Sequence, residues 1–290
     1  MPINLAQLRA FHMVATQGSF TKAAKALNVT QPTVSGQVGA LEEGAGVRLF
    51  ERQGRGVRLT ALGSQLLGVT TRLFALHDEA EELLSASMNL EAGRLAVGAD
   101  SPFTVMPLLS RLSRRHPGVT FDLTLGNSAE VLRNLYDYRT DVGVLADIRV
   151  DPRLIAHPLL SPRVMAFVPR THPWAREREV MLAAFQDQPM VWRTGGSVTR
   201  QVFERALAER AITPAVVMEI NTREATREAV AAGFGIGVIA ENEFGMDPRL
   251  VLLPINDADL RMTIYAVCLR ERRRLRTVRA FMDIAQEYAA

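Results

Sequence analysis

The sequence predicts an α/β protein in which three short helices and a hairpin precede one long helix and a two-lobed α/β body. Three observations support this fold class. Apolar residues recur at helical spacing near the N-terminus, a heptad pattern without proline begins at Ala61, and strand-like segments alternate with helices from Gly93 onward. We therefore expect domains over residues 1–60, 61–92 and 93–290, which a chain of 290 residues can accommodate.

Composition excludes several classes of protein. A hydrophobic content of 48% and a charged content of 22% are typical of globular domains. The single cysteine, Cys268, excludes an internal disulfide framework and suits a reducing compartment. The N-terminus lacks the pattern of a signal peptide, and no apolar run is long enough to span a bilayer. We therefore expect a cytoplasmic protein that has no membrane partner.

Basic residues are concentrated at the N-terminus. The chain has 34 Lys or Arg and 31 Asp or Glu, of which seven and three lie in residues 1–60. This gives the N-terminal part a net charge of +4 and leaves 27 basic and 28 acidic groups, a net charge of −1, in the remainder. A small basic head on a neutral body indicates a module that binds a polyanion.

The first 30 residues predict two helices joined by a turn to a third. The apolar spacing gives a helix over about 5–17, which Gly18 ends. Ser19 is the expected N-cap of a second helix over 20–27, and residues 28–30 form a short turn. Two short helices connected in this way form a helix-turn-helix.

The stretch TQPTVSGQVGALEE, residues 30–43, predicts a helix that carries two glycines in its interior. Thr30 is a favourable N-cap and Pro32 falls in the first turn, where proline is tolerated. Gly36 and Gly39 each cost roughly 1 kcal/mol relative to alanine. Such a helix must gain its stability from packing, and the absence of side chains at positions 36 and 39 needs an explanation.

The helical spacing places the two glycines on the outward face. Val34, Val38 and Leu41 form one stripe, which we expect to pack on the first two helices. Gly36 and Gly39 then lie near the opposite side, where a recognition helix meets the major groove. We interpret this face as adapted to fit against DNA; the alternative is a poorly optimised solvated face.

A hairpin is expected directly after this helix. Residues 49–50 and 57–59 are strand-like and flank a turn whose tip is Arg55. A basic tip suits phosphates or a narrow minor groove. Thr60 is the expected cap of the long helix that follows.

The first 60 residues resemble the N-terminal domain of LysR-type transcriptional regulators. The matches, in order, are Phe11, Gly18, Ser19, Phe20, Ala23, Ala24, Leu27, Gln31, Val34, Ser35, Leu41, Glu42, Leu49, Phe50, Arg52, Leu59, Thr60 and Gly63. The resemblance implies a winged helix-turn-helix and assigns DNA contacts to Gln31, Pro32, Thr33 and Ser35. To these we add Ser19, Thr21, Thr30, Gln37, Arg52 and Arg55. The chain departs from the family at Gly36 and Gly39, where a basic or larger polar residue is frequent.

The heptad pattern predicts a rod from Ala61 to about Met88, roughly 40 Å long. We expect it to pair with the same helix of a second chain; the alternative is a helix packed on its own domain. Pairing would place two heads on one duplex, which implies an operator with two-fold symmetry. The resemblance further implies a homotetramer made of two homodimers. The candidate dimerisation residues are Leu62, Leu66, Val69, Leu73, Leu76 and Leu83.

The remainder predicts two α/β lobes. Strands are expected at 94–99, 119–126, 141–145, 164–169, 190–193, 215–220, 236–240 and 263–269. Helices are expected at 105–116, 129–138, 198–211, 223–233 and from about 274. Two such lobes with two crossovers resemble the effector domain of LysR regulators, which is similar to type 2 periplasmic binding proteins. Lobe I would span about 93–162 and 266–290, and lobe II about 163–265.

Three strand-to-helix junctions, in ADSPF, GNSAE and TGGSVTR, present backbone N–H groups and hydroxyls suited to an anion. Such loops gather at one cleft, although each serine alone could be a simple N-cap. The resemblance places a small-molecule effector between the lobes, and we expect a carboxylate, phosphate or phosphonate. The candidate effector-binding residues are Ser101, Phe103, Asn127, Ser128, Arg193, Gly196, Ser197, Val198 and Thr199.

No motif indicates an enzyme. The segment GFGIGVI, residues 233–239, loosely resembles a dinucleotide fingerprint, but its glycines follow a helix and precede a strand, so Gly233 is better explained as a helix C-cap. The five histidines lack metal-ligand spacing, and Cys268 lies in an apolar strand pattern. We expect no enzymatic activity, no cofactor and no metal. A solute-binding protein is a second alternative, which the basic head and the missing export signal oppose.

The sequence thus predicts a one-component bacterial transcription regulator with a DNA-binding head, a dimerising rod and a ligand-sensing body. RNA polymerase would be a further partner if the protein is an activator. The strings GNSAEVL and REATREAVAAG resemble regulators associated with aminoethylphosphonate catabolism, which implies a phosphonate effector.

Overall fold

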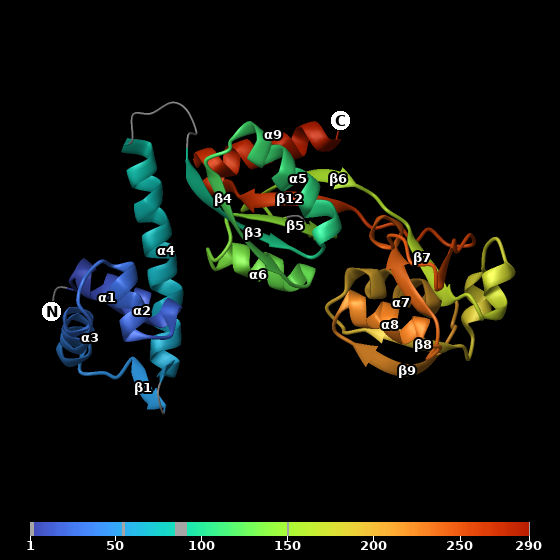
Figure 1. Ribbon diagram of the computed structural model, residues 1–290, viewed down its shortest axis with the longest axis horizontal. Helices are drawn as coiled ribbons and strands as arrows, with labels where there is room; N and C mark the ends of the chain where they lie inside the picture. The colour runs from blue at the N-terminus through green and yellow to red at the C-terminus, as the bar shows by residue number, and fades with distance from the viewer. Residues whose placement is uncertain (1–2, 54–55, 85–91, 150, 290) are drawn as a thin grey trace. The chain divides into compact units, whose positions relative to one another are not determined.

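The computed structural model describes residues 3–53, 56–84, 92–149 and 151–289. The chain divides into two compact units, Met1–Ala86 and Ser87–Ala290 (Figure 1). No helix within the described ranges is long and apolar enough to cross a membrane.

The first unit is a three-helix core with a hairpin and a long helix. Its elements are α1 (Leu5–Gln17), α2 (Phe20–Ala26), α3 (Gln31–Ala45), β1 (Phe50–Gln53), β2 (Gly56–Leu59) and α4 (Ala61–Leu84). Phe11 and Val14 of α1 are fully buried against Val34 and Val38 of α3. The stripe predicted for the third helix therefore does face the core, and β1 and β2 form the predicted antiparallel hairpin.

The predicted caps of this unit are present. Gly18 ends α1 with φ +62°, a left-handed conformation that favours glycine. The hydroxyls of Ser19, Thr30 and Thr60 each accept a hydrogen bond from the backbone N–H three residues further on. Arg55, the predicted wing tip, and Met88, the predicted end of the rod, lie outside the described residues.

In the second unit, lobe I is built on a five-stranded sheet in the order β4-β3-β5-β12-β6. Its elements are β3 (Gly93–Ala99), α5 (Pro102–Arg115), β4 (Val119–Leu125), α6 (Ser128–Tyr136), β5 (Val142–Ala146), β6 (Leu154–Leu160), β12 (Ile264–Leu269), the 3-10 helix η4 (Arg270–Arg274) and α9 (Arg276–Ala289). Strand β3 runs parallel to β4 and β5, whereas β12 is antiparallel to both of its neighbours. Helices α5 and α9 cover one face and α6 covers the other (Figure 1). Cys268 of β12 is fully buried, and burial raises the pKa of its thiol to about 11.

Lobe II contains two small sheets, β10-β7-β11 and β8-β9. Its elements are β7 (Val164–Pro169), η1 (Pro173–Arg176), η2 (Leu182–Phe185), β8 (Pro189–Arg193), α7 (Val198–Glu209), β9 (Ala215–Ile220), α8 (Arg223–Ala231), β10 (Gly237–Ala240), η3 (Glu241–Glu243) and β11 (Leu250–Leu253). A parallel bridge between Met190 and Ile236 links the two sheets. Val230 of α8 packs in one core cluster, and Phe203 of α7 packs in another. Gly233 follows α8 with φ +87°, as its predicted role at the helix C-terminus requires.

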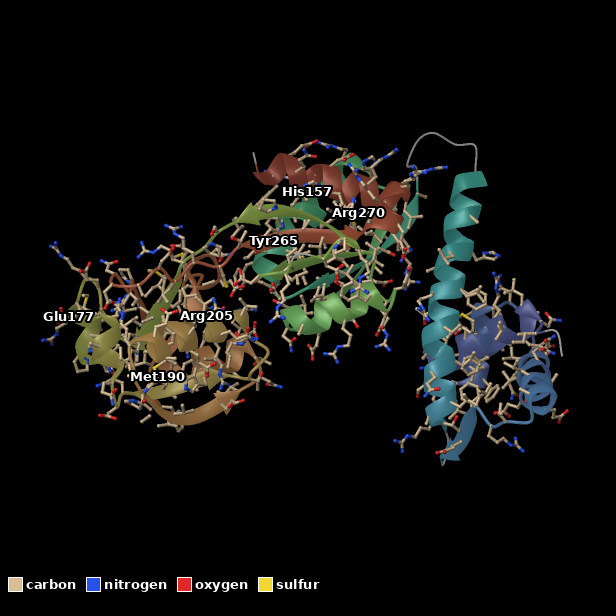
Figure 2. The ribbon with its side chains drawn as sticks, turned by 180° about the vertical axis from the view of Figure 1, so that it is seen from behind. His157, Glu177, Met190, Arg205, Tyr265 and Arg270 are labelled. Atoms are coloured by element: carbon tan, nitrogen blue, oxygen red, sulfur yellow. The ribbon has the colours of Figure 1, made fainter. Side chains whose placement is uncertain are left out.

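Sequence patterns failed to predict two strands, β6 and β11. Strand β6 contains His157 and Pro158, and proline is a poor fit to an interior strand. The structure places β6 at the edge of its sheet, beside β12, and His157 and Tyr265 mark these two strands in Figure 2. Pro158 lies opposite Tyr265 and is tolerated because β6 is an edge strand. Strand β11 has four residues and is also an edge strand, which leaves little periodicity to detect.

The chain passes between the lobes twice, after β6 and before β12, and the two connections lie side by side. Arg163 and Arg261 form an antiparallel bridge. The backbone N–H of Val164 donates to the carbonyl of Leu260 at 2.7 Å. Paired connections of this kind form a compact hinge, about which two lobes can close.

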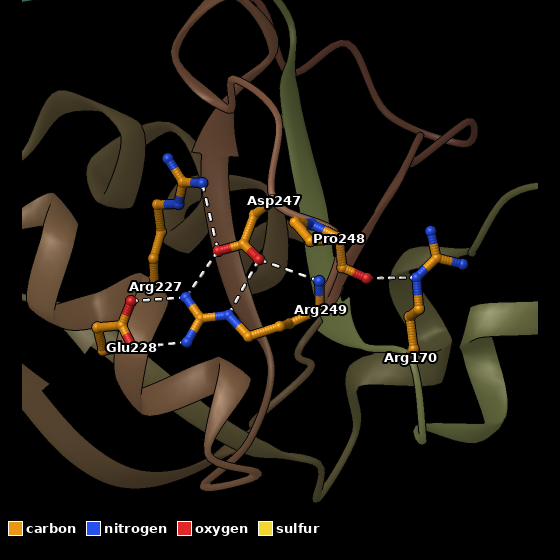
Figure 3. A network of polar contacts seen from close by, with 6 residues as sticks. All are labelled: Arg170, Arg227, Glu228, Asp247, Pro248 and Arg249. Atoms are coloured by element: carbon orange, nitrogen blue, oxygen red, sulfur yellow. Dashed lines mark hydrogen bonds and ion pairs between the residues drawn. The ribbon is translucent and has the colours of Figure 1, made fainter.

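A network of charged side chains holds α8 against the rest of lobe II (Figure 3). The guanidinium of Arg249 donates to both carboxylate oxygens of Glu228 at 2.8 and 2.6 Å and to Asp247 at 2.8 Å. Arg227, on the same helix as Glu228, lies 3.5 Å from Asp247. Hydrogen bonds from Arg249 lower the pKa of Asp247 below its usual range. The helix that begins at Arg223 is therefore fixed in position.

Candidate functional site

The outward face of α3 has the composition that the sequence predicted. Gln31, Pro32, Thr33 and Ser35 are exposed, and so is Gly36, whereas Gly39 is half-buried. The other predicted DNA-contacting residues are placed less uniformly. Thr21 and Thr30 are exposed, Ser19 and Gln37 are half-buried, and the side chain of Arg52 lies outside the described part of the molecule, as does Arg55.

A groove of about 540 Å³ runs between α2, α3 and the hairpin. Four of the predicted DNA-contacting residues line it, namely Ser19, Thr21, Gln31 and Ser35. Gly39 and Arg48 also line it, whereas Thr30, Pro32, Thr33 and Gln37 lie outside it. The groove is open along the exposed side of α3, which suits an extended ligand better than a small molecule.

Glu42 is a positioning residue that sequence reasoning missed. It is buried, and its carboxylate accepts hydrogen bonds from the backbone N–H groups of Leu49 and Phe50 at 2.6 and 3.1 Å. Arg48 lies 3.3 Å from the same carboxylate. Glu42 therefore fixes the start of the hairpin relative to α3. A buried acid on the core side of an otherwise apolar stripe was the signal that could have revealed it.

The candidate dimerisation residues divide into two groups on α4. Leu62, Val69 and Leu76 are 44%, 50% and 51% exposed and form an apolar stripe. Leu66 packs partly on the core of the head, and Leu73 is half-buried. The side chain of Leu83 lies outside the described residues. The stripe thus leaves apolar surface uncovered within its own unit.

A cavity of about 20 Å³ lies between the two lobes of residues 93–290, which is room for about one water molecule. Seven of the nine candidate effector-binding residues line it: Asn127, Ser128, Arg193, Gly196, Ser197, Val198 and Thr199. The N-termini of α6 and α7, one from each lobe, therefore meet at this cavity. Gly196 is needed there, because a Cβ would stand 2.6 Å from the side-chain nitrogen of Asn127 in the opposite lobe.

Two candidate residues do not line the cavity. Phe103 is 41% exposed. Ser101 is fully buried, its hydroxyl does not cap α5, and it acts on the carboxylate of Glu243, whose pKa it lowers. Two other hydroxyls already have partners, since Ser128 donates to Asp100 at 2.6 Å and Thr199 to the sulfur of Met262 at 3.8 Å. The serines are thus less available to a ligand than the sequence suggested.

The charged residues of the cavity are mostly ones that sequence reasoning missed. Asp100, Arg223 and Glu243 line it together with Arg193. Nε of Arg223 lies 2.6 Å from the carboxylate of Glu243. Its terminal nitrogens donate to the backbone carbonyl of Asp100 at 3.2 Å. Asp100 directly follows β3 and Arg223 opens α8, so their places at the ends of strand and helix were the available signal.

Burial dominates the electrostatics of these groups. It raises the pKa of Asp100, although hydrogen bonds from Ser128 and from the backbone of Ala146 oppose the shift. Burial likewise raises the pKa of Glu243, against the attraction of Arg223. Two acids whose pKa values are raised lie beside two arginines, so the charge of the cavity depends on whether the acids are protonated.

Arg193 is the cation of the cavity that has no ion-pair partner within the described ranges. Its Nε is buried without a hydrogen-bond partner there. Burial and the neighbouring Arg223 lower the pKa of its guanidinium. Its backbone is fixed, because Arg200 donates to its carbonyl oxygen at 2.6 Å. An anion in the cavity would supply the partner that Arg193 lacks.

Within the described part of the chain, no group of three or more His, Cys, Asp or Glu side chains is placed to hold a metal ion.

Two family models match this chain. Residues 5–64 match the bacterial regulatory helix-turn-helix protein model of the LysR family, and residues 89–290 match the LysR substrate binding domain. The RuBisCO operon transcriptional regulator of Allochromatium vinosum is 31% identical over 298 residues, which cover 100% of this chain and 98% of that protein. The HTH-type transcriptional activator CmpR of Synechocystis sp. is 28% identical over 96% of this chain and 93% of its own length.

Solved structures share the fold. A full-length OxyR variant from Pseudomonas aeruginosa aligns with 99% of this chain and 95% of its own, with a TM-score of 0.80 and 23% identity. The regulatory domain of Synechocystis CcmR, in complex with 2-PG, aligns with 68% of this chain and 97% of its own, with a TM-score of 0.62 and 21% identity.

Proposed function

Because the chain belongs to the LysR family of bacterial transcription regulators, we propose that a small anionic effector binds in its interlobe cavity and controls how its head binds operator DNA. The chain is a DNA-binding transcription regulator and not an enzyme, as the family match over both of its parts establishes. The solute-binding alternative is excluded on the same ground, since a transport protein has no need of a helix-turn-helix.

Arg193 is the observation that carries the anion proposal. Its guanidinium lines the cavity, and its Nε is buried without a partner in the described residues. The carboxylates of Glu243 and Asp100 attract this partly desolvated guanidinium without forming an ion pair with it, so an anion within hydrogen-bond distance would stabilise it. The N-termini of α6 and α7 add backbone N–H groups from both lobes, which favour a negative group at the same place.

The size of the cavity requires the lobes to separate when the effector enters. At about 20 Å³ the cavity has no room for a carboxylate or phosphate compound. The paired connections at Arg163 and Arg261 provide a hinge for this opening. An effector that enters in this way changes the closure of the lobes, and linkage requires that operator DNA and effector alter each other's affinity by the same factor.

Titration calorimetry against small carboxylates, phosphates, phosphonates and 2-PG tests the proposal. We expect an anion to be the tightest ligand and Arg193→Ala to weaken it by about tenfold to a hundredfold. Arg205→Ala is the matched control, because Arg205 is an exposed arginine of lobe II outside the cavity (Figure 2). A neutral or cationic compound as the tightest ligand, or equal effects of the two substitutions, would contradict the proposal.

The DNA-binding part of the proposal rests on α3 and the groove beside it. We assign base contacts to Gln31 and Ser35, which are exposed and line the groove. Gln31→Ala should reduce the discrimination between bases at one or two base pairs of the operator, by roughly 1–3 kcal/mol of binding free energy. An unchanged preference in a selection from random duplexes would remove Gln31 from the reading residues.

The assembly is a homodimer formed through the apolar stripe of α4, with a homotetramer as the larger form. Two heads on one duplex then read an operator with two-fold symmetry. The protein acts in the cytoplasm, where its DNA lies, and RNA polymerase is a further partner if it activates. The association with aminoethylphosphonate catabolism stays a prediction, and phosphonates are in the calorimetry panel for that reason.

A further inference from the structure

Gly36 and Gly39 are two glycines of α3 that the free protein does not explain. The fold accounts for glycine at several other positions: Gly18 has φ +62°, and a Cβ at Gly63 would stand 2.2 Å from the carbonyl oxygen of Leu49. Gly68 of α4 has the same open surroundings as Gly36 and Gly39, so open space alone does not identify a DNA contact. A Cβ at Gly36 or Gly39 would meet no atom within 4 Å, and neither residue has a positive φ. Nothing in the folded head therefore excludes a side chain at either position.

Both glycines weaken the helix that carries them. A glycine in a helix interior loses more backbone entropy on folding than alanine does. Neither Gly36 nor Gly39 recovers this loss by close packing, since the space above each is open. Two such glycines on one stripe of a single helix, unlike the lone Gly68 of α4, point to a demand that arises when another molecule lies against this face.

The position of the two glycines identifies that molecule. With Pro32 and Glu43 they follow one stripe of α3, on the side opposite the buried Val34 and Val38. Gly39 also lines the groove of the head, next to two of the candidate base-contacting residues. The stripe thus lies on the outward side of the second helix of the helix-turn-helix, the helix that such motifs place in the major groove.

We propose that Gly36 and Gly39 form a close-approach surface, on which the backbone of α3 lies directly against the base edges of the operator. The inference rests on the proposed function, because it requires that the head bind duplex DNA. Without side chains on the central stripe, the helix enters the major groove more deeply. Ser35 and Thr33, which flank the stripe, then reach the bases from either side. A side chain at position 36 or 39 pushes the helix outward and breaks these contacts.

Alanine substitutions separate this role from helix stability. The full-length variants Gly36→Ala and Gly39→Ala are compared with Gly68→Ala, since Gly68 is an exposed helical glycine of α4 whose Cβ would also meet nothing within 4 Å. The probe is a duplex selected by the wild-type chain from a randomised library. We expect all three variants to melt about 2–4 °C higher by calorimetry. Operator binding should weaken about tenfold for the two α3 variants and less than twofold for Gly68→Ala.

Arginine at position 36 provides a second, opposite test. A close-approach surface predicts that Gly36→Arg weakens operator binding. A merely solvated face predicts the reverse, because the arginine would add a phosphate contact and steepen the salt dependence by about one unit. The inference is overturned if the alanine variants bind like wild type or if Gly36→Arg binds more tightly. If the wild-type chain selects no sequence at all, the proposed function itself fails, and this inference with it.

Discussion

The guanidinium of Arg223, in lobe II, donates hydrogen bonds of 3.2 Å to the backbone carbonyl of Asp100, in lobe I. The same side chain is paired with Glu243 at 2.6 Å. Arg223 therefore joins the two lobes at the cavity while its charge is already balanced within lobe II. We infer from this arrangement that Arg223 holds the lobes closed and that Arg193 is the cation that binds the anion.

Replacing Arg223 by lysine should open the lobes. Lysine keeps the positive charge beside Glu243 but lacks the planar fork that reaches the carbonyl of Asp100. We expect Arg223→Lys to increase the radius of gyration of the unliganded protein in solution scattering and to weaken effector binding by about tenfold. Arg205→Lys is the control. Scattering curves that are identical for the two variants would show that Arg223 does not hold the lobes together.

Anion binding should depend on pH through the two acids of the cavity. Because burial raises the pKa of Asp100 and of Glu243, these groups take up protons as pH falls from neutrality towards their raised values. Each protonation makes the cavity more positive, so the affinity for an anion rises at lower pH and falls as pH increases through these pKa values. Sulfate is a suitable probe, since its charge stays constant between about pH 5 and pH 8.

The substitution Asp100→Asn isolates one of the two acids. An amide oxygen can still accept hydrogen bonds from Ser128 and Ala146, so the local geometry is kept while the charge is removed. We expect tighter sulfate binding at neutral pH and a flatter pH profile in titration calorimetry. An unchanged profile together with weaker binding would show that the charge of Asp100 does not control the anion site.

The apolar stripe of α4 should be the dimer interface. Val69→Asp places a charge on a residue that is 50% exposed in its own unit, so the substitution should leave the head folded but separate the chains. We expect a lower mass by light scattering and a severe loss of operator affinity, because two heads no longer bind together. Ser64→Asp, at an exposed position on a different face of the same helix, should keep the wild-type mass. If both variants keep it, the chains associate elsewhere.

Glu42 should stabilise the head through the start of the hairpin. In Glu42→Ala the buried N–H of Leu49 loses its acceptor, and an unsatisfied buried donor costs about 1–3 kcal/mol. We expect a lower melting temperature for the head and weaker binding to all DNA sequences. The control is Glu51→Ala, which removes an exposed acid of the hairpin itself. Equal melting temperatures for the two variants would contradict this role.

Local patterns predicted the elements, whereas the charged site needed the tertiary structure. The caps at Ser19 and Thr30 and the end at Gly18 are local chemistry, so they could be read from adjacent residues. Arg223 and Asp100 are 123 positions apart, and no short motif records that they meet. The serines at the helix N-termini were overvalued, since a sequence does not show that Ser128 already has a partner.

The distribution of tryptophan and cysteine decides how lobe closure can be observed. Both tryptophans, Trp174 and Trp192, lie in lobe II, while Cys268 is a fully buried thiol in lobe I with a pKa of about 11. The native thiol therefore resists alkylation at neutral pH, and one cysteine introduced on the surface of lobe I can be labelled alone. When tryptophan is excited selectively, so that the tyrosines of lobe I do not contribute, a dye at that position would accept excitation energy only from donors in the other lobe. The natural chain therefore already contains the donors for a distance measurement across the hinge.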